Sequence, residues 1–470
     1  MDAAALESRT TAQWDEEIVP QLTDYIRVPA KSPHFDPAWA ANGHIERVVS
    51  QADAWVRQQP VKGLHCEIVR LPGRTPVLWF EVPATGQARG TVLLYGHLDK
   101  QPEMIGWRAD LGPWTPKYEG GKLYGRGGAD DGYAVFASLA AIGALQAQGV
   151  AHARCVGIIE TCEESGSYDL PPYLESLKQR MGAVDFVVGL DSGCGDYERL
   201  WVTTSLRGLA AGTLDVEVLT EGVHSGDASG VVPSSFRVAR ALLDRLEESA
   251  TGTIRPREFH ASIPDERVAQ SRAAADILGD LVFRKYPWAG DTQPMIDDRA
   301  QALLNRTWRP ALSVVGADGL PSIATAGNVL RPRTSLKLSL RLPPTVEGET
   351  ATAAMKKVLE AEVPHRTKVT FTADQGATGW NAPPTAAWLD QAMQAASQRF
   401  YAKPAAAMGE GGTIPFMGML GRQFPDAHFL ITGVLGPGSN AHGPNEFLHV
   451  PYAKKLTACV ASVIAAHAER

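Results

Sequence analysis

The chain has 470 residues, of which 44% are hydrophobic and 21% are charged, a balance typical of a soluble globular protein of about three domains. The formal net charge of −7 argues against a broad basic surface, so we expect no nucleic-acid partner. Its five cysteines include no C-x-x-C pair, which argues against a disulfide framework and a thiolate zinc site and favours a reducing compartment.

Neither a signal peptide nor a membrane span is predicted. The N-terminal segment lacks a basic region followed by an apolar core. An uncharged stretch runs from Gly132 to Ala153, but it is rich in alanine and interrupted by Gln146 and Gln148. Because its transfer into a bilayer would be weakly favourable, we expect a helix buried inside a soluble, cytoplasmic protein that does not contact a membrane.

The first half of the chain alternates strands with helices. The first 60 residues are predicted to be helical, with a proline-containing loop at 29–37. Short apolar runs bounded by glycine or proline then predict buried strands at 76–82, 90–96, 155–160, 186–190 and 201–204. This alternation indicates a largely parallel sheet with helices on both faces.

The pattern changes after residue 207. Residues 209–218 and 334–342 alternate apolar and polar positions, which predicts a sheet with one solvated face. Long helices and buried strands return near residue 381. We therefore predict an α/β domain made of residues 1–207 and 379–470, interrupted by an inserted α+β domain at 208–378. Residues 255–310 are expected to form a long excursion on the inserted domain, with no assigned role.

Five segments that follow or lie between the buried strands carry carboxylate or imidazole side chains. They contain His97 with Asp99, Asp130 with Asp131, Glu163 with Glu164, Asp191, and His442. Since ligands bind at the carboxyl ends of strands in open α/β sheets, these segments can converge. Carboxylates gathered there would repel one another unless cations neutralised them. Two divalent metals would do so, and mixed His, Asp and Glu ligation suits Zn²⁺, with Mn²⁺ or Co²⁺ as alternatives.

Several motifs occur in a characteristic order: GHLDKQP at 96–102, GKLYGRGGADD at 121–131, EESG at 163–166, GVHSG at 222–226 and GEGGTIP at 409–415. With them, the chain resembles the di-zinc aminoacylase/carnosine-dipeptidase metallopeptidase family. This family includes acetylornithine deacetylase, succinyl-diaminopimelate desuccinylase and glutamate carboxypeptidase, and the cytosolic dipeptidase branch is the most similar. The resemblance implies a zinc-exopeptidase-like, three-layer catalytic domain with a mostly parallel central sheet, interrupted by a dimerisation and lid domain.

The resemblance also implies the metal ligands. His97 and Asp191 match ligands of the first metal, and Glu164 and His442 match ligands of the second. Asp130 matches the aspartate that bridges the two metals. Each subunit is therefore expected to bind two divalent ions.

Three further residues match catalytic positions of the family. Asp99 matches the carboxylate that orients His97, since the second N–H of a ligating imidazole needs a partner. Glu163 matches the general base, which would take a proton from the metal-bridging water and pass it to the leaving amine. His224 lies in the inserted domain and matches a residue that acts in trans on the oxyanion in the partner subunit of a homodimer. A surface histidine at a strand end is the alternative for His224.

Four residues are predicted to bind substrate. Arg341 can hold a substrate carboxylate with two hydrogen bonds, although it can also be a solubilising charge on an edge strand. Gly412 and Thr413 belong to a glycine-rich segment whose backbone N–H groups can face an anion. Asn328 is a candidate donor near the carbonyl or carboxylate of the substrate, or else a turn residue.

We therefore predict two-metal hydrolysis of dipeptides or short peptides with a free C-terminal carboxylate, by a dipeptidase or carboxypeptidase-type exopeptidase. The alternatives are an N-acyl amino acid deacylase that uses the same site and a catalytically silent dimeric binding protein. The complete ligand set together with Glu163 argues against the silent protein. One departure from the dipeptidase pattern is Gly132-Tyr133, where such relatives carry Lys-Gly; it removes no ligand but affects the turn.

Overall fold

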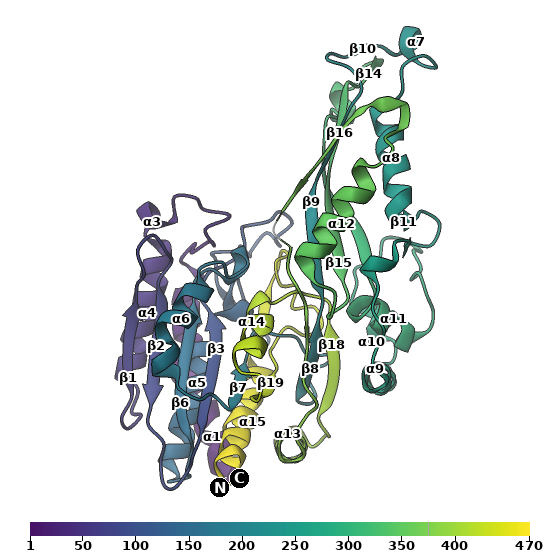
Figure 1. Cartoon of the computed structure of the whole chain (residues 1–470). Helices are drawn as coiled ribbons and strands as arrows, with labels where there is room; N and C mark the ends of the chain where they lie inside the picture. The colour runs from purple at the N-terminus through teal and green to yellow at the C-terminus, as the bar shows by residue number, and fades with distance from the viewer. Residues whose placement is uncertain (375) are drawn as a thin grey trace.

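The computed structural model describes residues 1–374 and 376–470. Two parts are visible in Figure 1: a broad lobe in which the N- and C-termini lie close together, and an elongated part that carries the middle of the chain. Within the described residues, no helix combines the length and the apolar character needed to cross a membrane.

The broad lobe is built on a six-stranded sheet. Its strands lie in the order β1 (His65–Val69), β2 (Val77–Val82), β6 (Arg154–Glu160), β3 (Thr91–His97), β7 (Phe186–Gly189) and β19 (His428–Ile431). β2 is antiparallel to both neighbours, whereas β6, β3, β7 and β19 are parallel. The predicted α/β class with a mostly parallel central sheet is thus confirmed.

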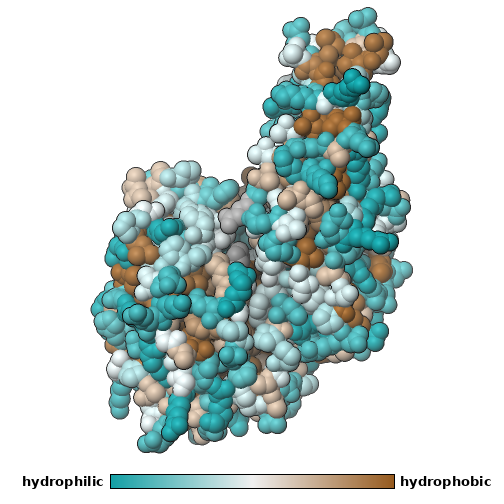
Figure 2. All heavy atoms as spheres, in the orientation of Figure 1, coloured by the Kyte–Doolittle hydropathy of each residue, from teal (hydrophilic) through white to brown (hydrophobic). Residues whose placement is uncertain are grey.

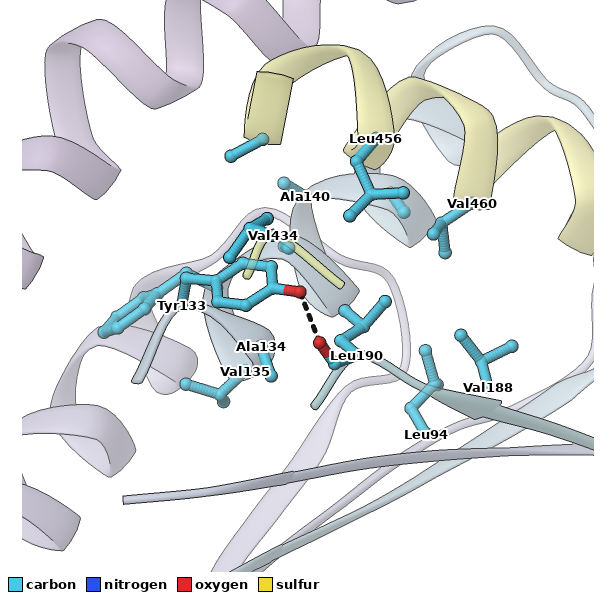
Figure 3. Close-up of a cluster of buried hydrophobic side chains, with 14 of the residues drawn as sticks. Leu94, Tyr133, Ala134, Val135, Ala140, Val188, Leu190, Val434, Leu456 and Val460 are labelled. Atoms are coloured by element: carbon cyan, nitrogen blue, oxygen red, sulfur yellow. Dashed lines mark hydrogen bonds between the residues drawn. The ribbon is translucent and has the colours of Figure 1, made fainter. Parts of the chain in front are cut away.

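Helices cover both faces of this sheet and make the outer layers. On one face lie α1 (Ala3–Gln13), α2 (Val19–Ile26), α4 (His44–Gln58), α5 (Ala134–Ala147), α13 (Ala387–Tyr401) and α15 (Val450–Ala468), and on the other lie α6 (Leu170–Met181) and α14 (Pro415–Gln423). Side chains of β3 alternate between the faces: Leu94 packs toward α5 and α15 (Figure 3), whereas Leu93 belongs to the core beneath α6 and α14. As predicted from its lack of charge, α5 is buried on nearly all sides.

Two smaller sheets complete the lobe. The strand predicted at 201–204 is β8 (Trp201–Leu206), which does not join the central sheet but pairs with β17 (Trp380–Asn381) and β18 (Ala406–Glu410). β4 (Lys117–Glu119), β5 (Lys122–Tyr124) and β20 (Phe447–His449) form the other sheet. β8 is fully buried like the central strands, so its burial in a core does not reveal which sheet it joins.

The elongated part contains a second, antiparallel sheet. Its order is β13 (Ala311–Asp318), β15 (Arg333–Leu342), β9 (Gly208–Glu217) and β16 (Lys368–Ala373), with α8 (Ser235–Leu246) and α12 (Gly348–Glu360) packed on one face. Buried and partly exposed residues alternate along β15, in agreement with the predicted half-solvated sheet. The hydrophobic core of this part is separate from the others. We therefore propose 208–378 as the inserted domain, as the sequence predicts.

The excursion at 255–310 packs differently from our prediction. Its helices are α9 (Asp265–Leu278), α10 (Leu281–Arg284) and α11 (Arg299–Thr307). α9 and α11 contact β18, and Leu278 and Leu303 join the core cluster of the broad lobe rather than that of the inserted sheet. An apolar helix face indicates that the helix packs against another element of the chain, but it does not identify that element. The excursion therefore returns to the lobe that carries the predicted metal ligands.

Candidate metal centre and active site

The predicted metal ligands meet where the central strands end. His97 is the last residue of β3, and Asp191 follows two residues after β7. Glu164 lies in a short 3₁₀ turn after β6, and Asp130 lies in the turn that precedes α5. His442 comes from the loop between β19 and β20. The buried parallel strands thus place side chains from distant parts of the sequence at one edge of the sheet.

Two groups of potential ligand atoms form at this edge. In the first group, His97, Asp130 and Asp191 place one atom each within 4.8 Å of the others, and Asp130, Glu164 and His442 do the same in the second. Asp130 belongs to both groups: its Oδ1 lies 3.3 Å from Nε2 of His97, and its Oδ2 lies 3.0 Å from Nε2 of His442. All five predicted ligands therefore lie together, with Asp130 between the two groups.

The chemistry of this donor set fits divalent cations. The two groups contain only imidazole and carboxylate side chains. Oε1 of Glu164 is buried and has no hydrogen-bond partner among the described residues, whereas its Oε2 accepts a hydrogen bond of 2.6 Å from Gln101. A buried carboxylate oxygen without a partner is costly unless a cation approaches it. The residues present can thus bind divalent metal ions such as Zn²⁺.

Burial and mutual repulsion shift the protonation of this centre. Burial raises the pKa of Glu164 to about 8 and that of Asp191 to about 7, and the charge of Asp130 contributes to both shifts. Burial acts to lower the pKa of His442, but Glu164 and Asp130 outweigh it and raise this pKa to about 10. Protons therefore occupy the metal-free site, and metal binding must release them.

Asp99 positions two elements of the centre at once. Its backbone carbonyl oxygen lies 3.1 Å from Nδ1 of His97, and its Oδ1 lies 3.5 Å from the same nitrogen. Its two carboxylate oxygens also accept hydrogen bonds from the backbone N–H groups of Glu163 and Glu164, at 3.1 and 3.0 Å. We predicted Asp99 as the partner of His97, and its contacts with the turn behind β6 are an additional finding. The buried residue Asp99 thus orients the imidazole of His97 and fixes the backbone of the glutamate pair.

Glu163 faces a cavity of about 270 Å³ together with three of the predicted ligands, Asp130, Asp191 and His442. Burial raises the pKa of Glu163 well above its usual range, and the negative charge of Asp191 adds to this shift. Three of the predicted substrate-binding residues, Arg341, Gly412 and Thr413, line the same cavity. Nη1 of Arg341 donates a hydrogen bond of 3.0 Å to Oγ1 of Thr413. The inserted-domain strand β15 therefore delivers a cation to the cavity that holds the metal ligands.

The other two predicted site residues lie elsewhere. His224 ends the short strand β10 (Val223–His224), which pairs with β14 (Val329–Leu330), and Asn328 directly precedes β14. Both are exposed, and their elements, with α7 (Ser225–Ala228), form the far tip of the inserted domain in Figure 1. The backbone N–H of Ser225 donates to the carbonyl of Asn328 at 2.9 Å, so the two residues belong to one local unit. The structure does not bring this unit to the metal ligands of its own chain.

The departure at Gly132-Tyr133 is accommodated by packing. The Tyr133 hydroxyl donates to the carbonyl of Leu190, the residue before Asp191 (Figure 3). At position 132, a Cβ atom would lie 2.3 Å from the ring of Tyr25. Gly132 therefore allows Tyr25 to approach closely, and Tyr133 supports the loop that carries Asp191.

The residues that hold the His442 loop were missed by our sequence reasoning. Nη2 of Arg126 donates to the carbonyls of His442 and Gly443, at 3.0 and 3.1 Å. Arg126 also forms a buried ion pair with Glu446, whose Oε1 accepts a hydrogen bond of 2.8 Å from the N–H of Gly127. Arg126 lies inside the motif at 121–131. Its place in that motif was the sequence signal that could have identified it as a site residue. Glu410, which also lines the cavity, is another motif residue to which we assigned no role.

The sequence of this chain is similar to those of known peptidases. The profile of Peptidase family M20/M25/M40 matches residues 93–466. The cysteinylglycine-S-conjugate dipeptidase of Corynebacterium striatum is 26% identical over 378 residues, which cover 77% of this chain and 79% of that protein. The beta-Ala-His dipeptidase of Homo sapiens is 29% identical over 276 residues, which cover 57% of this chain and only about half, 53%, of that protein.

Solved structures show the same fold over the whole chain. The crystal structure of human carnosine dipeptidase 1 has a TM-score of 0.80 at 21% identity and covers 100% of this chain and 99% of its own. The structure of the di-peptidase Dug1p of Saccharomyces cerevisiae has a TM-score of 0.79 at 22% identity, with the same coverage.

Proposed function

Because this chain belongs to Peptidase family M20/M25/M40, a family of metallopeptidases that use divalent metal ions, we propose that it is a two-metal dipeptidase. His97, Asp130 and Asp191 would hold one ion, and Asp130, Glu164 and His442 the other, with Zn²⁺ as the expected metal and Mn²⁺ or Co²⁺ as alternatives. The observation that carries the proposal is the place of Asp130 in both ligand groups. The dipeptidase names of the two similar proteins support the substrate class.

Glu163 would move the proton in this reaction. Bound divalent ions supply Lewis acidity, which activates water and polarises the scissile carbonyl. Glu163 lies in the cavity without belonging to either ligand group, so its carboxylate is free to accept a proton from the attacking water. When the C–N bond breaks, the same group can return that proton to the leaving amine.

Substrate selection would depend on both ends of the dipeptide. Arg341 offers a guanidinium that can bind a free C-terminal carboxylate, with its orientation fixed by Thr413. An N-acyl amino acid also has this carboxylate, so a deacylase remains the alternative function. Glu410 favours the dipeptide, because its carboxylate lines the cavity and can pair with an N-terminal ammonium that an N-acyl amino acid lacks.

A homodimer formed through the inserted domain would place His224 and Asn328 at the partner's active site. Large apolar side chains are exposed on this domain, including Val231 (85%), Val315 (63%) and Ile323 (97%). Figure 2 shows apolar surface gathered at its tip. β13 is also an edge strand with one unpaired side among the described residues. Exposed apolar surface beside an open sheet edge supports a protein–protein interface.

The proposed function is tested with zinc-loaded protein and three related compounds: Ala-Ala, Ala-Ala amide and N-acetyl-alanine. We expect Ala-Ala to have the highest kcat/KM. The amide should lose about 10- to 100-fold, because it leaves the charge of Arg341 unpaired. Rapid hydrolysis of N-acetyl-alanine without hydrolysis of Ala-Ala would support the deacylase instead.

A further inference from the structure

A second cavity, of about 500 Å³, adjoins the catalytic one. Helices α9, α10 and α11 of the 255–310 excursion form part of its wall, together with β18, the loop after β7 and the loop that carries His442. Glu410 and Leu435 line both cavities. The excursion, to which the sequence assigned no role, therefore helps to enclose a space directly beside the metal ligands.

The charged groups of this cavity are poorly paired. Arg306 and Lys285 line it opposite a single carboxylate, Glu410. Nη1 of Arg306 lies 3.7 Å from Oε2 of Glu410, and its Nη2 contacts Sδ of Met408 at 3.7 Å. The Nε of Arg306 is buried and has no hydrogen-bond partner among the described residues. A guanidinium offers five N–H donors, so most of the capacity of Arg306 is unused.

Further guanidinium groups lie near Arg306. Nε of Arg207 donates to the carbonyl of Gly411 at 3.2 Å, in the turn that follows Glu410. Burial, together with the nearby charges of Arg341 and Arg306, lowers the pKa of Arg207 to about 10. The junction of the two cavities thus has an excess of positive charge, which an anionic group would relieve.

The expected path of a dipeptide connects these observations. If its C-terminal carboxylate binds Arg341 and its carbonyl lies at the metal ligands, the N-terminal residue can extend toward Glu410 and Leu435, which line both cavities. An ammonium bound to Glu410 would then compete with Arg306 for the carboxylate. Arg306 would be left as a half-buried charge without a partner unless the substrate supplied a second negative group.

We propose that the second cavity binds the N-terminal residue of the substrate and selects side chains with a carboxylate, which Arg306 and Lys285 bind while Glu410 binds the ammonium. N-terminal glutamyl and aspartyl dipeptides are the substrate class that this assignment predicts. The inference rests on the proposed dipeptidase function, because it requires the scissile carbonyl to lie at the metal ligands.

The test compares Glu-Ala, the isosteric neutral Gln-Ala and the cationic Lys-Ala on zinc-loaded full-length protein. We expect kcat/KM for Glu-Ala to exceed that for Gln-Ala by about 10- to 100-fold, with Lys-Ala slowest. Arg306→Gln should bring the Glu-Ala to Gln-Ala ratio close to one. Lys285→Gln changes an exposed residue and should lower the same ratio, which keeps the test valid if Arg306→Gln does not fold.

Arg284→Gln provides the matched control, since Arg284 directly precedes Lys285 but is 75% exposed and pairs with Asp280. This variant should leave the ratio unchanged. Equal rates on Glu-Ala and Gln-Ala in the wild type, or a ratio unaffected by both cavity substitutions, would overturn the inference while leaving the dipeptidase proposal intact. Hydrolysis of Ala-Ala but of none of the three dipeptides would also overturn the inference alone, whereas failure to hydrolyse Ala-Ala as well would overturn the dipeptidase proposal and the inference with it.

Discussion

Glu163→Gln is expected to lower kcat for dipeptide hydrolysis by about 10²- to 10⁴-fold without changing metal content, because a positioned general base contributes an effect of this size. The amide cannot accept the proton of the attacking water, yet Glu163 belongs to neither ligand group. Steady-state kinetics and elemental analysis of the same preparation provide the two measurements.

Glu164→Gln is the matched control for this prediction, because Asp99 holds the backbone N–H groups of both glutamates in the same way. Replacing Glu164 should reduce metal content as well as activity, since its carboxylate belongs to the second ligand group. Undiminished turnover in Glu163→Gln would eliminate Glu163 as the base. Loss of metal from that variant would instead make Glu163 a ligand.

His224→Ala is expected to abolish most activity while the metal ligands remain intact, because His224 would act only in the partner's active site. A mixed dimer distinguishes this explanation from a local structural effect. Co-expression of a His224→Ala chain and a Glu163→Gln chain with different affinity tags allows the heterodimer to be purified. One of its two sites would then contain both an intact Glu163 and an intact His224, so about half of the wild-type activity should return.

Two outcomes of this experiment would contradict the proposed assembly. An inactive heterodimer would exclude the action of His224 in trans, and a fully active His224→Ala homodimer would exclude any catalytic role for His224. Sedimentation of the wild-type chain provides the control, since the exposed apolar side chains of the inserted domain should be buried in a dimer.

Much of the fold could be predicted because buried parallel strands leave a strong pattern in the sequence. The apolar runs at 76–82, 90–96, 155–160 and 186–190 all became strands of the central sheet. Because the ends of such strands share one edge, the same pattern also indicated that His97, Glu164 and Asp191 would lie close together. Local periodicity was sufficient for these features, since each strand carries its own signal.

Features that depend on the choice of packing partner could not be predicted in this way. β8 is fully buried like the central strands but joins another sheet, and the excursion helices bury their apolar faces against β18 rather than the inserted sheet. The support of His442 by Arg126 joins residues that are 316 positions apart, so only the fold reveals it. For the same reason, the position of His224 at the tip of the inserted domain does not reveal its role within a single chain.

The central claim is that divalent metal ions held by both ligand groups make this chain a dipeptidase. The most direct test removes metal with a chelator and then follows Ala-Ala hydrolysis as Zn²⁺ is added in steps. Since Asp130 joins two groups of ligand atoms, activity should be absent from the metal-free protein and reach its plateau at two equivalents of metal per chain. A plateau at one equivalent, or hydrolysis that does not depend on added metal, would contradict the two-metal account.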